Sequence, residues 1–374
     1  MRILQISNYY PPHIGGIEQV ACDVATSLKG KVEQRVLCFH HEKGDVRETV
    51  DGVEVIRAGT FAKVASQSLS CSFGRLLKKT FREFQPDVVI FHCPNPFEAY
   101  FLKKQLKKNP SCKLVVWWHL DITKQKVLGK LFTRQSKWLL TRAVKVVATS
   151  PNYIQGSLQL QSVREKCTVI PCCANKARIF ADETVLARAE ELRSEYAGKV
   201  LLFAVGRHVP YKGIEYLVRA SKFLDDNYAV CIGGSGPLTS ELKKLAEGDV
   251  KVHFLGRVSD AELKAYLCAC DIFCFPSVTK NEAFGIALAE AMSFAKPAVT
   301  FTIPGSGVNY VSLDGVTGLE CPNGNAEAYA AALRTLAEDD TLRKRCGEAA
   351  RARVQALFTQ EKFAEHVDRL LAEL

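Results

Sequence analysis

Short runs of apolar residues alternate along the chain with longer segments in which apolar positions recur every three or four residues. In the first half, the runs predict strands at residues 1–7, 35–40, 53–57, 87–92, 113–119, 143–149 and 167–171. The longer segments predict helices at residues 17–29, 72–83, 97–108 and 128–140. Because buried strands that alternate with helices form parallel sheets covered on both faces, this pattern predicts a doubly wound α/β domain.

The same alternation starts again near residue 200. Apolar runs predict strands at residues 200–206, 228–233, 250–255, 271–275, 298–301 and 318–321. Helical patterns follow at residues 213–223, 238–246, 260–268, 285–294 and 326–339, with a long helical tail to residue 374. We therefore expect two doubly wound domains with a boundary near residues 174–182, and a ligand in the cleft between them, at the carboxyl ends of the strands.

Composition and cysteine spacing narrow the class of protein. The chain has 374 residues, of which 47% are hydrophobic and 24% charged, as in ordinary globular proteins. It holds no apolar run of the roughly 18–20 residues that span a bilayer and opens with no signal-peptide pattern, so we expect a cytoplasmic protein. None of its 14 cysteines forms a C-x-x-C pair, which favours reduced, buried thiols over disulfides or zinc.

Positive charge is concentrated in the first half. Residues 1–175 carry 26 Lys and Arg against 13 Asp and Glu, whereas residues 176–374 carry 24 against 27. This asymmetry indicates an anionic partner: nucleic acid, an anionic membrane surface or a phosphorylated substrate. Nucleic acid is the least favoured, because no aromatic-basic module for it is present. The basic residues within 78–82 and 103–108 fit either a membrane-facing surface or ordinary solvated helix faces.

Two glycine-rich turns follow predicted strands. Gly15 and Gly16 precede the first helix, where glycines let the backbone approach a phosphate and the helix N-terminus favours an anion. The segment GGSGP at 233–237, with Ser235 and Gly236, suits close packing of a nucleoside. The first turn lacks the G-x-G-x-x-G spacing of dinucleotide sites, and both turns fit a purely structural role equally well.

The segment GRHVPYKG at 206–213 places two cations after a predicted strand. Arg207 can bind phosphate oxygens through two parallel hydrogen bonds, and Lys212 can place a compact charge beside them. The alternative is a pair of solvated surface cations.

The segment NEAFGIALAE at 281–290 holds two glutamates around a predicted helix start. Glu282 precedes the helix, which Gly285 and Ile286 open with free N–H groups. Glu290 lies about 7–8 Å further along the axis, and its side chain leans back toward the N-terminus. This layout suits a nucleotide sugar, because each carboxylate can accept hydrogen bonds from one of its two sugars while the diphosphate lies at the helix end.

These segments together resemble the GT-B glycosyltransferases of family 4, nearly from end to end. The resemblance implies two Rossmann-like domains that face a central cleft. Residues 1–175 would bind the acceptor, residues 176–355 would bind the nucleotide sugar, and a C-terminal helix, 356–374, would return to the first domain. It also implies a retaining hexosyltransferase that needs no metal or other cofactor, and the sequence has no D-x-D metal motif.

The resemblance also implies residue roles. Glu290 would bind the ribose, Glu282 the transferred sugar, and Arg207 and Lys212 the diphosphate. His119 matches the active-site histidine of the family, which contacts the donor sugar. The implied catalytic set is therefore His119, Arg207, Lys212 and Glu282. The implied donor-binding set is Gly15, Gly16, Gly206, Ser235, Gly236, Arg257, Val258, Ala283, Phe284, Gly285, Ile286 and Glu290.

The first half is similar, more narrowly, to bacterial O-antigen and exopolysaccharide mannosyltransferases, which use GDP-mannose. This likeness rests on YPP, GGIEQ, HLDI, KQK and TSPNY at residues 10–12, 15–19, 119–122, 124–126 and 149–153. The chain departs from the family pattern at three places that bear on donor or acceptor details. PCCA at 171–174 replaces a P-x-G-hydrophobic-D stretch, His208 replaces an apolar residue, and Ala295 replaces a glycine.

The expected reaction is a front-face substitution in which the leaving diphosphate helps to deprotonate the acceptor. The protein would then act by positioning and charge stabilisation. The expected partners are a nucleotide-sugar donor and a glycan or lipid-diphosphate-linked acceptor of bacterial surface polysaccharide, with GDP-mannose favoured over a UDP-sugar. The remaining alternatives are a sugar-nucleotide 2-epimerase and a non-catalytic nucleotide-sugar-binding protein.

Overall fold

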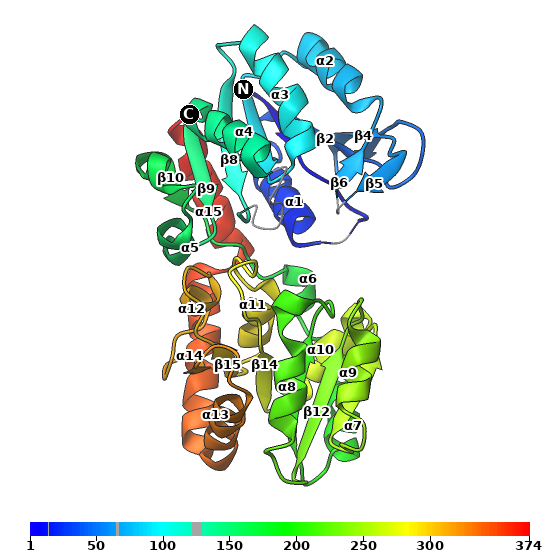
Figure 1. Ribbon diagram of the computed structural model, residues 1–374, viewed down its shortest axis with the longest axis vertical. Helices are drawn as coiled ribbons and strands as arrows, with labels where there is room; N and C mark the ends of the chain where they lie inside the picture. Colours follow the sequence, from blue (N-terminus) through cyan, green and yellow to red (C-terminus); the bar gives the residue numbers. More distant parts are fainter. Residues whose placement is uncertain (14, 65–66, 122–128) are drawn as a thin grey trace. The chain divides into compact units, whose positions relative to one another are not determined.

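The computed structural model describes residues 1–13, 15–64, 67–121 and 129–374. The chain forms two compact units (Figure 1). Unit 1 comprises Met1–Ile170 together with Phe363–Leu374, and unit 2 comprises Pro171–Lys362.

Unit 1 contains an eight-stranded sheet of order β10-β9-β8-β7-β1-β2-β4-β3. Its described strands pair in parallel except at the edge, where β3 runs antiparallel to β4. Every residue of β7 is buried, as expected of a strand covered on both faces. The strands are β1 (Arg2–Ile6), β2 (Glu33–Phe39), β3 (Val46–Val50), β4 (Val53–Ala58), β7 (Val88–Cys93), β8 (Lys113–Trp118), β9 (Lys145–Ala148) and β10 (Cys167–Val169), with a separate hairpin of β5 (Ala62–Val64) and β6 (Gln67–Leu69).

Helices connect the parallel strands of unit 1 (Figure 1). They are α1 (Gly16–Leu28), α2 (Phe73–Phe84), α3 (Pro96–Lys108), α4 (Gly129–Arg142), α5 (Pro151–Gly156) and the 3-10 helix η1 (Gln161–Lys166). Asn95 caps α3 by accepting from Glu98 N at 3.0 Å, and Pro96 occupies its first turn, so the strand β7 turns sharply into this helix.

Unit 2 contains a six-stranded parallel sheet of order β13-β12-β11-β14-β15-β16. Its strands are β11 (Val200–Val205), β12 (Tyr228–Gly233), β13 (Val252–Gly256), β14 (Ile272–Phe275), β15 (Ala298–Phe301) and β16 (Gly318–Cys321). Its helices are α6 (Lys176–Ile179), α7 (Glu183–Glu195), η2 (Pro210–Lys212), α8 (Ile214–Ser221), α9 (Thr239–Leu245), α10 (Asp260–Ala269), α11 (Ile286–Ser293), α12 (Val308–Val311), α13 (Ala326–Glu338) and α14 (Asp340–Leu357).

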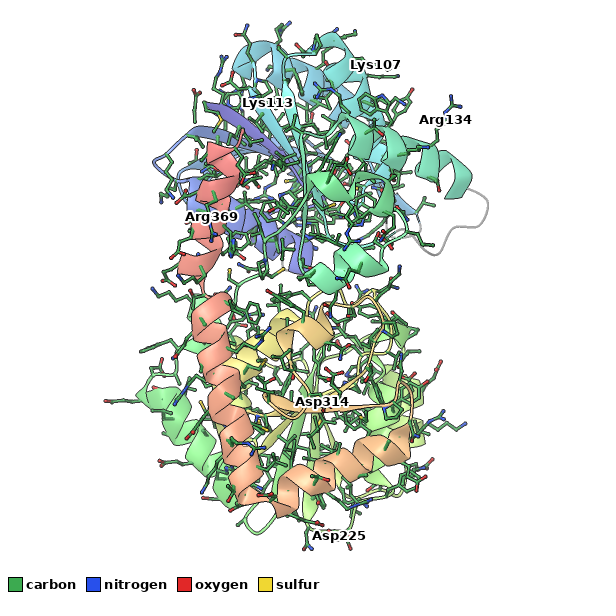
Figure 2. The ribbon with its side chains drawn as sticks, turned by 90° about the vertical axis from the view of Figure 1, so that its left-hand side faces the viewer. Lys107, Lys113, Arg134, Asp225, Asp314 and Arg369 are labelled. Atoms are coloured by element: carbon green, nitrogen blue, oxygen red, sulfur yellow. The ribbon has the colours of Figure 1, made fainter. Side chains whose placement is uncertain are left out.

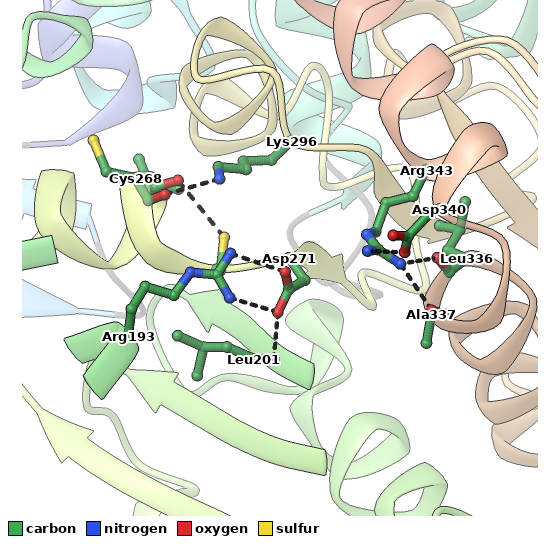
Figure 3. A network of polar contacts seen from close by, with 11 residues as sticks. Arg193, Leu201, Cys268, Asp271, Lys296, Leu336, Ala337, Asp340 and Arg343 are labelled. Atoms are coloured by element: carbon green, nitrogen blue, oxygen red, sulfur yellow. Dashed lines mark hydrogen bonds and ion pairs between the residues drawn. The ribbon is translucent and has the colours of Figure 1, made fainter. Parts of the chain in front are cut away.

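A polar network fixes the amino end of β14 in unit 2 (Figure 3). Arg193 on α7 binds Asp271 through two hydrogen bonds of 2.9 and 2.8 Å, and Asp271 also accepts from Leu201 N at 2.8 Å. Nearby, Lys296 donates to the carbonyl oxygen of Cys268 at 2.9 Å. These contacts hold β14 beside β11, and so they set where the opposite, carboxyl ends of the two strands lie.

The predicted pair of doubly wound sheets is confirmed, and so is the return of the C-terminal helix to the first domain. That helix, α15 (Gln360–Ala372), belongs from Phe363 onward to unit 1. Asp368 on α15 pairs with Lys31, which follows α1, at 2.6 Å. The elements not predicted from the sequence are the edge strand β3, the strands β5 and β6, the helix α7 and the short helices α5, η1, α6, η2 and α12. Within the described residues, no helix is both long and apolar enough to cross a membrane.

Candidate functional site

Three loops of unit 2 leave neighbouring strand ends and contact one another. Because β11 lies between β12 and β14, the loops that follow these strands start side by side. His208 N donates to the carbonyl oxygen of Ser235 at 3.1 Å, and Val278 N donates to that of Tyr211 at 3.0 Å. The three motifs predicted after these strands, at 206–213, 233–237 and 281–290, therefore meet at one edge of the sheet.

Lys212 and Glu282 form an ion pair at this edge. Their side chains are only 16% and 12% exposed, and Ser277 Oγ donates to Glu282 Oε2 at 3.1 Å. The Lys212 ammonium also lies 5.1 Å from the centre of the Phe275 ring. Burial alone lowers the pKa of Lys212, but the negative charge of Glu282 and the nearby Tyr211 outweigh it, so the pKa is raised. Lys212 therefore keeps its positive charge beside Glu282 although both side chains are largely buried.

Arg207 lies five residues before Lys212, in the same loop after β11. Its side chain is exposed, and its charge acts on Lys212 strongly enough to oppose the rise in the Lys212 pKa. Two cations therefore share the loop after β11, one of them paired and one open to solvent. Two such cations can bind an anionic ligand such as a diphosphate.

Glu290 lies on α11, deeper than Glu282, and is only 2% exposed. Arg178 on α6 approaches Glu290 Oε1 at 3.7 Å and Asp260 at 3.3 Å. Burial raises the pKa of Glu290 to about 7, although Arg178 lowers it. Among the described residues, Oε1 of Glu290 has no hydrogen-bond partner. A buried carboxyl oxygen without a donor is costly, so this atom is suited to accept from a ligand.

The start of α11 offers backbone donors. Gly285 precedes the helix with a φ of 97°, a conformation that residues with a Cβ rarely adopt, and no side chain caps this end. Phe284 is 3% exposed and packs edge-on against Phe358, with ring centres 5.3 Å apart. Of the predicted residues 283–286, Phe284 can therefore face a ligand only with its backbone.

The glycines after β12 allow two loops to touch. A Cβ added to Gly236 would lie 2.8 Å from His208 N, and one added to Gly234 would lie 2.9 Å from the carbonyl carbon of Gly206. Ser235 between them is exposed. The sequence left open whether this turn is structural or ligand-binding, and the structure shows a structural need for two of its glycines.

The two predicted positions after β13 differ in exposure. Arg257 is exposed, whereas Val258 packs beside Gly233, 3.5 Å from the place of a Cβ on that glycine. His208, one of the departures from the family pattern, is buried; its Nδ1 lies 2.9 Å from Thr239 Oγ1 and its ring lies edge-on to Phe254. Burial lowers the pKa of His208, so this histidine fills an apolar position as a neutral ring.

In unit 1, His119 follows β8 and is 6% exposed. Its Nε2 lies 3.0 Å from His92 Nδ1, and His92 Nε2 lies 3.1 Å from Gln5 Oε1. Burial lowers the pKa of His119 to about 3 and that of His92 well below its usual value. Both rings are therefore neutral at physiological pH.

Gly15 and Gly16 stand at the start of α1, beside two buried carboxyl groups. Glu18 is 9% exposed and Glu98 is fully buried; burial raises the pKa of each, and for Glu98 the neighbouring Glu18 raises it further. Both carboxyl oxygens of Glu98 lack a hydrogen-bond partner within the described part of the chain. The two carboxyl groups do not attract an anion, so a phosphate contact here would come from the glycine backbone or from Lys63, whose charge lowers the pKa of Glu18.

Sequence reasoning missed several residues that contact the predicted ones. Arg178, which faces Glu290, lies some hundred residues earlier in the chain on a single helical turn and has no local signal. Gln5 and His92 are buried within strands that the sequence presents simply as apolar runs. Ile122 and residues 124–126, part of the predicted likeness in the first half, lie outside the described residues. In the described ranges, no three His, Cys, Asp or Glu side chains gather as metal ligands would.

Two family models match consecutive parts of this chain. One is described as Glycosyltransferase Family 4 and matches residues 14–178. The other is described as Glycosyl transferases group 1 and matches residues 189–353.

Curated relatives match nearly the whole chain. The D-rhamnosyltransferase WbpZ of Pseudomonas aeruginosa is 35% identical over 96% of this chain and 92% of its own. The O-antigen chain mannosyltransferase C of Escherichia coli is 29% identical over 96% of this chain and 95% of its own.

Solved structures share the fold at low sequence identity. Sucrose-phosphate synthase from Thermosynechococcus elongatus superposes with a TM-score of 0.80 at 20% identity, covering 100% of this chain and 98% of its own. HepE of Anabaena, in its complex with UDP-glucose, superposes with a TM-score of 0.78 at 18% identity over 100% of both chains.

Proposed function

The chain belongs to family 4 of the glycosyltransferases and is a hexosyltransferase-type enzyme, and from this premise we propose that it transfers mannose from GDP-mannose with retention of configuration. The proposed acceptor is a glycan or a lipid-diphosphate-linked glycan of a bacterial surface polysaccharide such as O-antigen. Two relatives that cover almost the whole chain, one a mannosyltransferase and one a D-rhamnosyltransferase, support this class of reaction.

The ion pair between Lys212 and Glu282 is the observation that carries the proposal. A nucleotide sugar brings an anion for the lysine and hydroxyl donors for the glutamate, so it can satisfy both partners when they separate. Arg207, exposed on the same loop, would bind the diphosphate with Lys212. The open backbone donors at Gly285 and Ile286 would add hydrogen bonds to the same group.

Glu290 suits the proposed ribose site. Its Oε1, which Arg178 approaches only at 3.7 Å, can accept from a ribose hydroxyl, and Glu290 lies on α11 whereas Glu282 precedes this helix. Arg178 would orient this carboxylate from behind. The remaining proposed donor contacts are Gly15, Gly16 and His119 in unit 1, and Gly206, Ser235, Gly236, Arg257, Val258, Ala283 and Phe284 in unit 2.

The proposed reaction uses positioning and charge rather than a covalent intermediate. The acceptor hydroxyl oxygen forms a bond to the anomeric carbon on the face from which the diphosphate leaves, while the bond from that carbon to the diphosphate oxygen breaks. The acceptor proton passes to the departing diphosphate. Arg207 and Lys212 stabilise the charge that builds up on the leaving group, and Glu282 holds the transferred sugar.

The choice of sugar follows the likeness in the first half of the chain. D-Rhamnose is mannose without the hydroxyl at carbon 6, so the two relatives act on sugars that differ by one oxygen. We propose mannose because the segments at 119–122 and 149–153 resemble mannosyltransferases. A UDP-sugar donor is the alternative.

A transfer assay tests the proposal. Purified protein is incubated with a lipid-diphosphate glycan acceptor and GDP-mannose, GDP-D-rhamnose or UDP-glucose, and the product is measured by mass spectrometry. We expect a product one hexose heavier with GDP-mannose only. We expect turnover to fall by about 100-fold or more in Lys212→Met, as when a charge-stabilising donor is removed, and to stay normal in Lys222→Met, an exposed lysine on unit 2.

The rival reactions give different products in the same assay. A 2-epimerase would convert the nucleotide sugar without an acceptor, which an NMR time course of the nucleotide sugar alone would reveal. A non-catalytic binding protein would bind the donor and form no product. If product forms from UDP-glucose but not from GDP-mannose, the donor is a UDP-sugar and the proposal of GDP-mannose is wrong.

We further propose that the basic surface of α2 and α3 meets an anionic membrane in which the acceptor resides. The two helices pack together, and Lys78, Lys107 and Lys108 on them are exposed. Figure 2 shows Lys107 directed away from the protein. Replacing these three lysines by Gln should weaken binding to anionic vesicles by roughly fivefold per lysine.

Vesicle sedimentation measures this binding. Lys222, Lys243 and Lys244, exposed lysines of unit 2, are the control set for the same triple substitution. Equal binding of the wild-type protein to neutral and anionic vesicles would contradict the proposed contact between this basic surface and an anionic membrane.

A further inference from the structure

Three buried side chains of unit 1 form a chain of hydrogen bonds that ends at His119. Gln5 comes from β1, His92 from β7, and His119 directly follows β8, and these three strands are neighbours in the sheet. Gln5 and His92 are fully buried. Gln5 Oε1 lies 3.1 Å from His92 Nε2, and His92 Nδ1 lies 3.0 Å from His119 Nε2.

The placement of the Gln5 amide, with its oxygen toward His92, sets the direction of the chain. An amide oxygen can only accept, so His92 must donate to Gln5 through Nε2. A neutral imidazole carries one N–H, so the other nitrogen of His92, Nδ1, must accept. His119 must then donate through Nε2, and its own Nδ1 carries no proton.

The surroundings hold both rings neutral and in place. Burial lowers the pKa of each histidine, so neither ring carries a second proton at neutral pH. The His92 and His119 rings lie side by side in nearly one plane, with ring centres 5.3 Å apart and planes 15° apart, and His92 stacks on Trp117 with ring centres 5.8 Å apart. A ring packed in this way cannot turn freely, so the nitrogens keep their partners.

We propose that Gln5 and His92 are positioning residues that fix His119 in the tautomer with its proton on Nε2, so that Nδ1 is presented to the substrate as a hydrogen-bond acceptor. Such a nitrogen binds a hydroxyl group, which can donate, and does not bind a carboxylate or phosphate oxygen, which cannot. The identity of that hydroxyl as one of the donor sugar rests on the proposed function, whereas the tautomer does not.

The tautomer can be measured in the protein without any ligand. Protein labelled with ¹⁵N in its histidine rings is examined by long-range ¹H–¹⁵N correlation, and His119→Ala identifies the His119 signals. We expect the Nε2–H pattern for His119, in roughly tenfold excess over the other tautomer, which is what one buried hydrogen bond provides.

Two variants break the chain at different points. His92→Phe keeps an aromatic ring in the stack but removes both nitrogens, and Gln5→Met removes the acceptor that sets the direction. In either variant we expect the excess of the Nε2–H form of His119 to fall at least severalfold. Gln34→Met on the neighbouring strand β2 removes a part-buried amide that bonds to Ala25 instead, and it should leave the His119 pattern unchanged.

The outcomes separate this inference from the proposed function. A wild-type His119 with its proton on Nδ1, or a His119 pattern that either variant leaves intact, overturns the inference. If the tautomer shifts as expected in both His92→Phe and Gln5→Met, the inference holds. A parallel rise in KM or drop in kcat for sugar transfer then supports the contact between His119 and the donor sugar, and unchanged kinetics would remove that contact from the proposed function alone.

Discussion

Among single residues, Glu290 shows most clearly how burial sets the state of a charged group. It is 2% exposed, and burial raises the pKa of its carboxyl group from 4.5 to about 7 despite the nearby Arg178. The folded protein therefore holds a proton on Glu290 over a pH range in which the unfolded chain has already lost it. A group of this kind makes the folded state less stable as the pH rises.

We predict that ionisation of Glu290 costs stability between pH 4.5 and about 7. Over this window the free energy of unfolding of the wild-type protein should fall relative to that of Glu290→Gln, which cannot ionise. The shift corresponds to a difference on the order of 3 kcal/mol. Urea denaturation of both proteins at a series of pH values measures it.

Two further variants check the cause of this pH dependence. Glu327→Gln, an exposed glutamate in the first turn of α13, should show the wild-type pH dependence. Arg178→Met removes the cation that lowers the Glu290 pKa, so the decline should continue to higher pH than in the wild type. Parallel curves for the wild type and Glu290→Gln would show that Glu290 ionises at an ordinary carboxyl pKa.

At the scale of elements, the contact between the loops after β11 and β12 depends on the absence of side chains. Gly236 lies against the backbone of His208, which is itself fixed by a hydrogen bond to Ser235. Backbone atoms cannot move aside as the end of a flexible side chain can. The two loops that carry Arg207, Lys212 and Ser235 are therefore held at a fixed spacing by their glycines.

We predict that Gly236→Ala destabilises unit 2 by about 1–3 kcal/mol, the usual cost of overpacking. The added Cβ would meet three backbone atoms of His208, so one loop must shift. Gly206→Ala is the control, because a Cβ there meets only the Lys212 side chain, at 3.7 Å. The midpoint of urea unfolding followed by circular dichroism should drop for the first variant and stay within error for the second. Equal midpoints would show that the loops separate at no cost.

Most elements could be predicted from the sequence because buried parallel strands produce continuous apolar runs and their helices produce a 3.6-residue period. The edge strand β3 could not, because its central residues Arg47, Glu48 and Thr49 are exposed and leave no apolar run. For Lys212 and Glu282, the sequence predicts only that they lie at the same edge of one sheet, because each follows a strand of that sheet. Their direct contact, and that of Arg178 with Glu290, depends on side-chain placement that no local pattern encodes.

At the scale of the whole molecule, the chain does not divide into two consecutive halves. After completing unit 2 it returns to unit 1 through α15, whose Phe363, Val367 and Leu370 are buried. Phe363 packs against Trp117 of β8 with ring centres 5.9 Å apart. The family resemblance could predict this return, whereas composition and periodicity only indicate a helical tail with one apolar face.

Because α15 completes the core of unit 1, we predict that Phe363→Ala destabilises unit 1 and leaves unit 2 intact. Phe363 is 1% exposed, and loss of a fully buried phenylalanine costs about 3–5 kcal/mol through lost burial and the cavity left behind. Hydrogen exchange followed by mass spectrometry should show faster exchange in peptides of residues 1–170, and unchanged exchange in peptides of residues 171–362. Phe180→Ala, which removes a phenylalanine that is 68% exposed, should change neither set. Faster exchange confined to residues 171–362 would mean that the last helix serves the second unit after all.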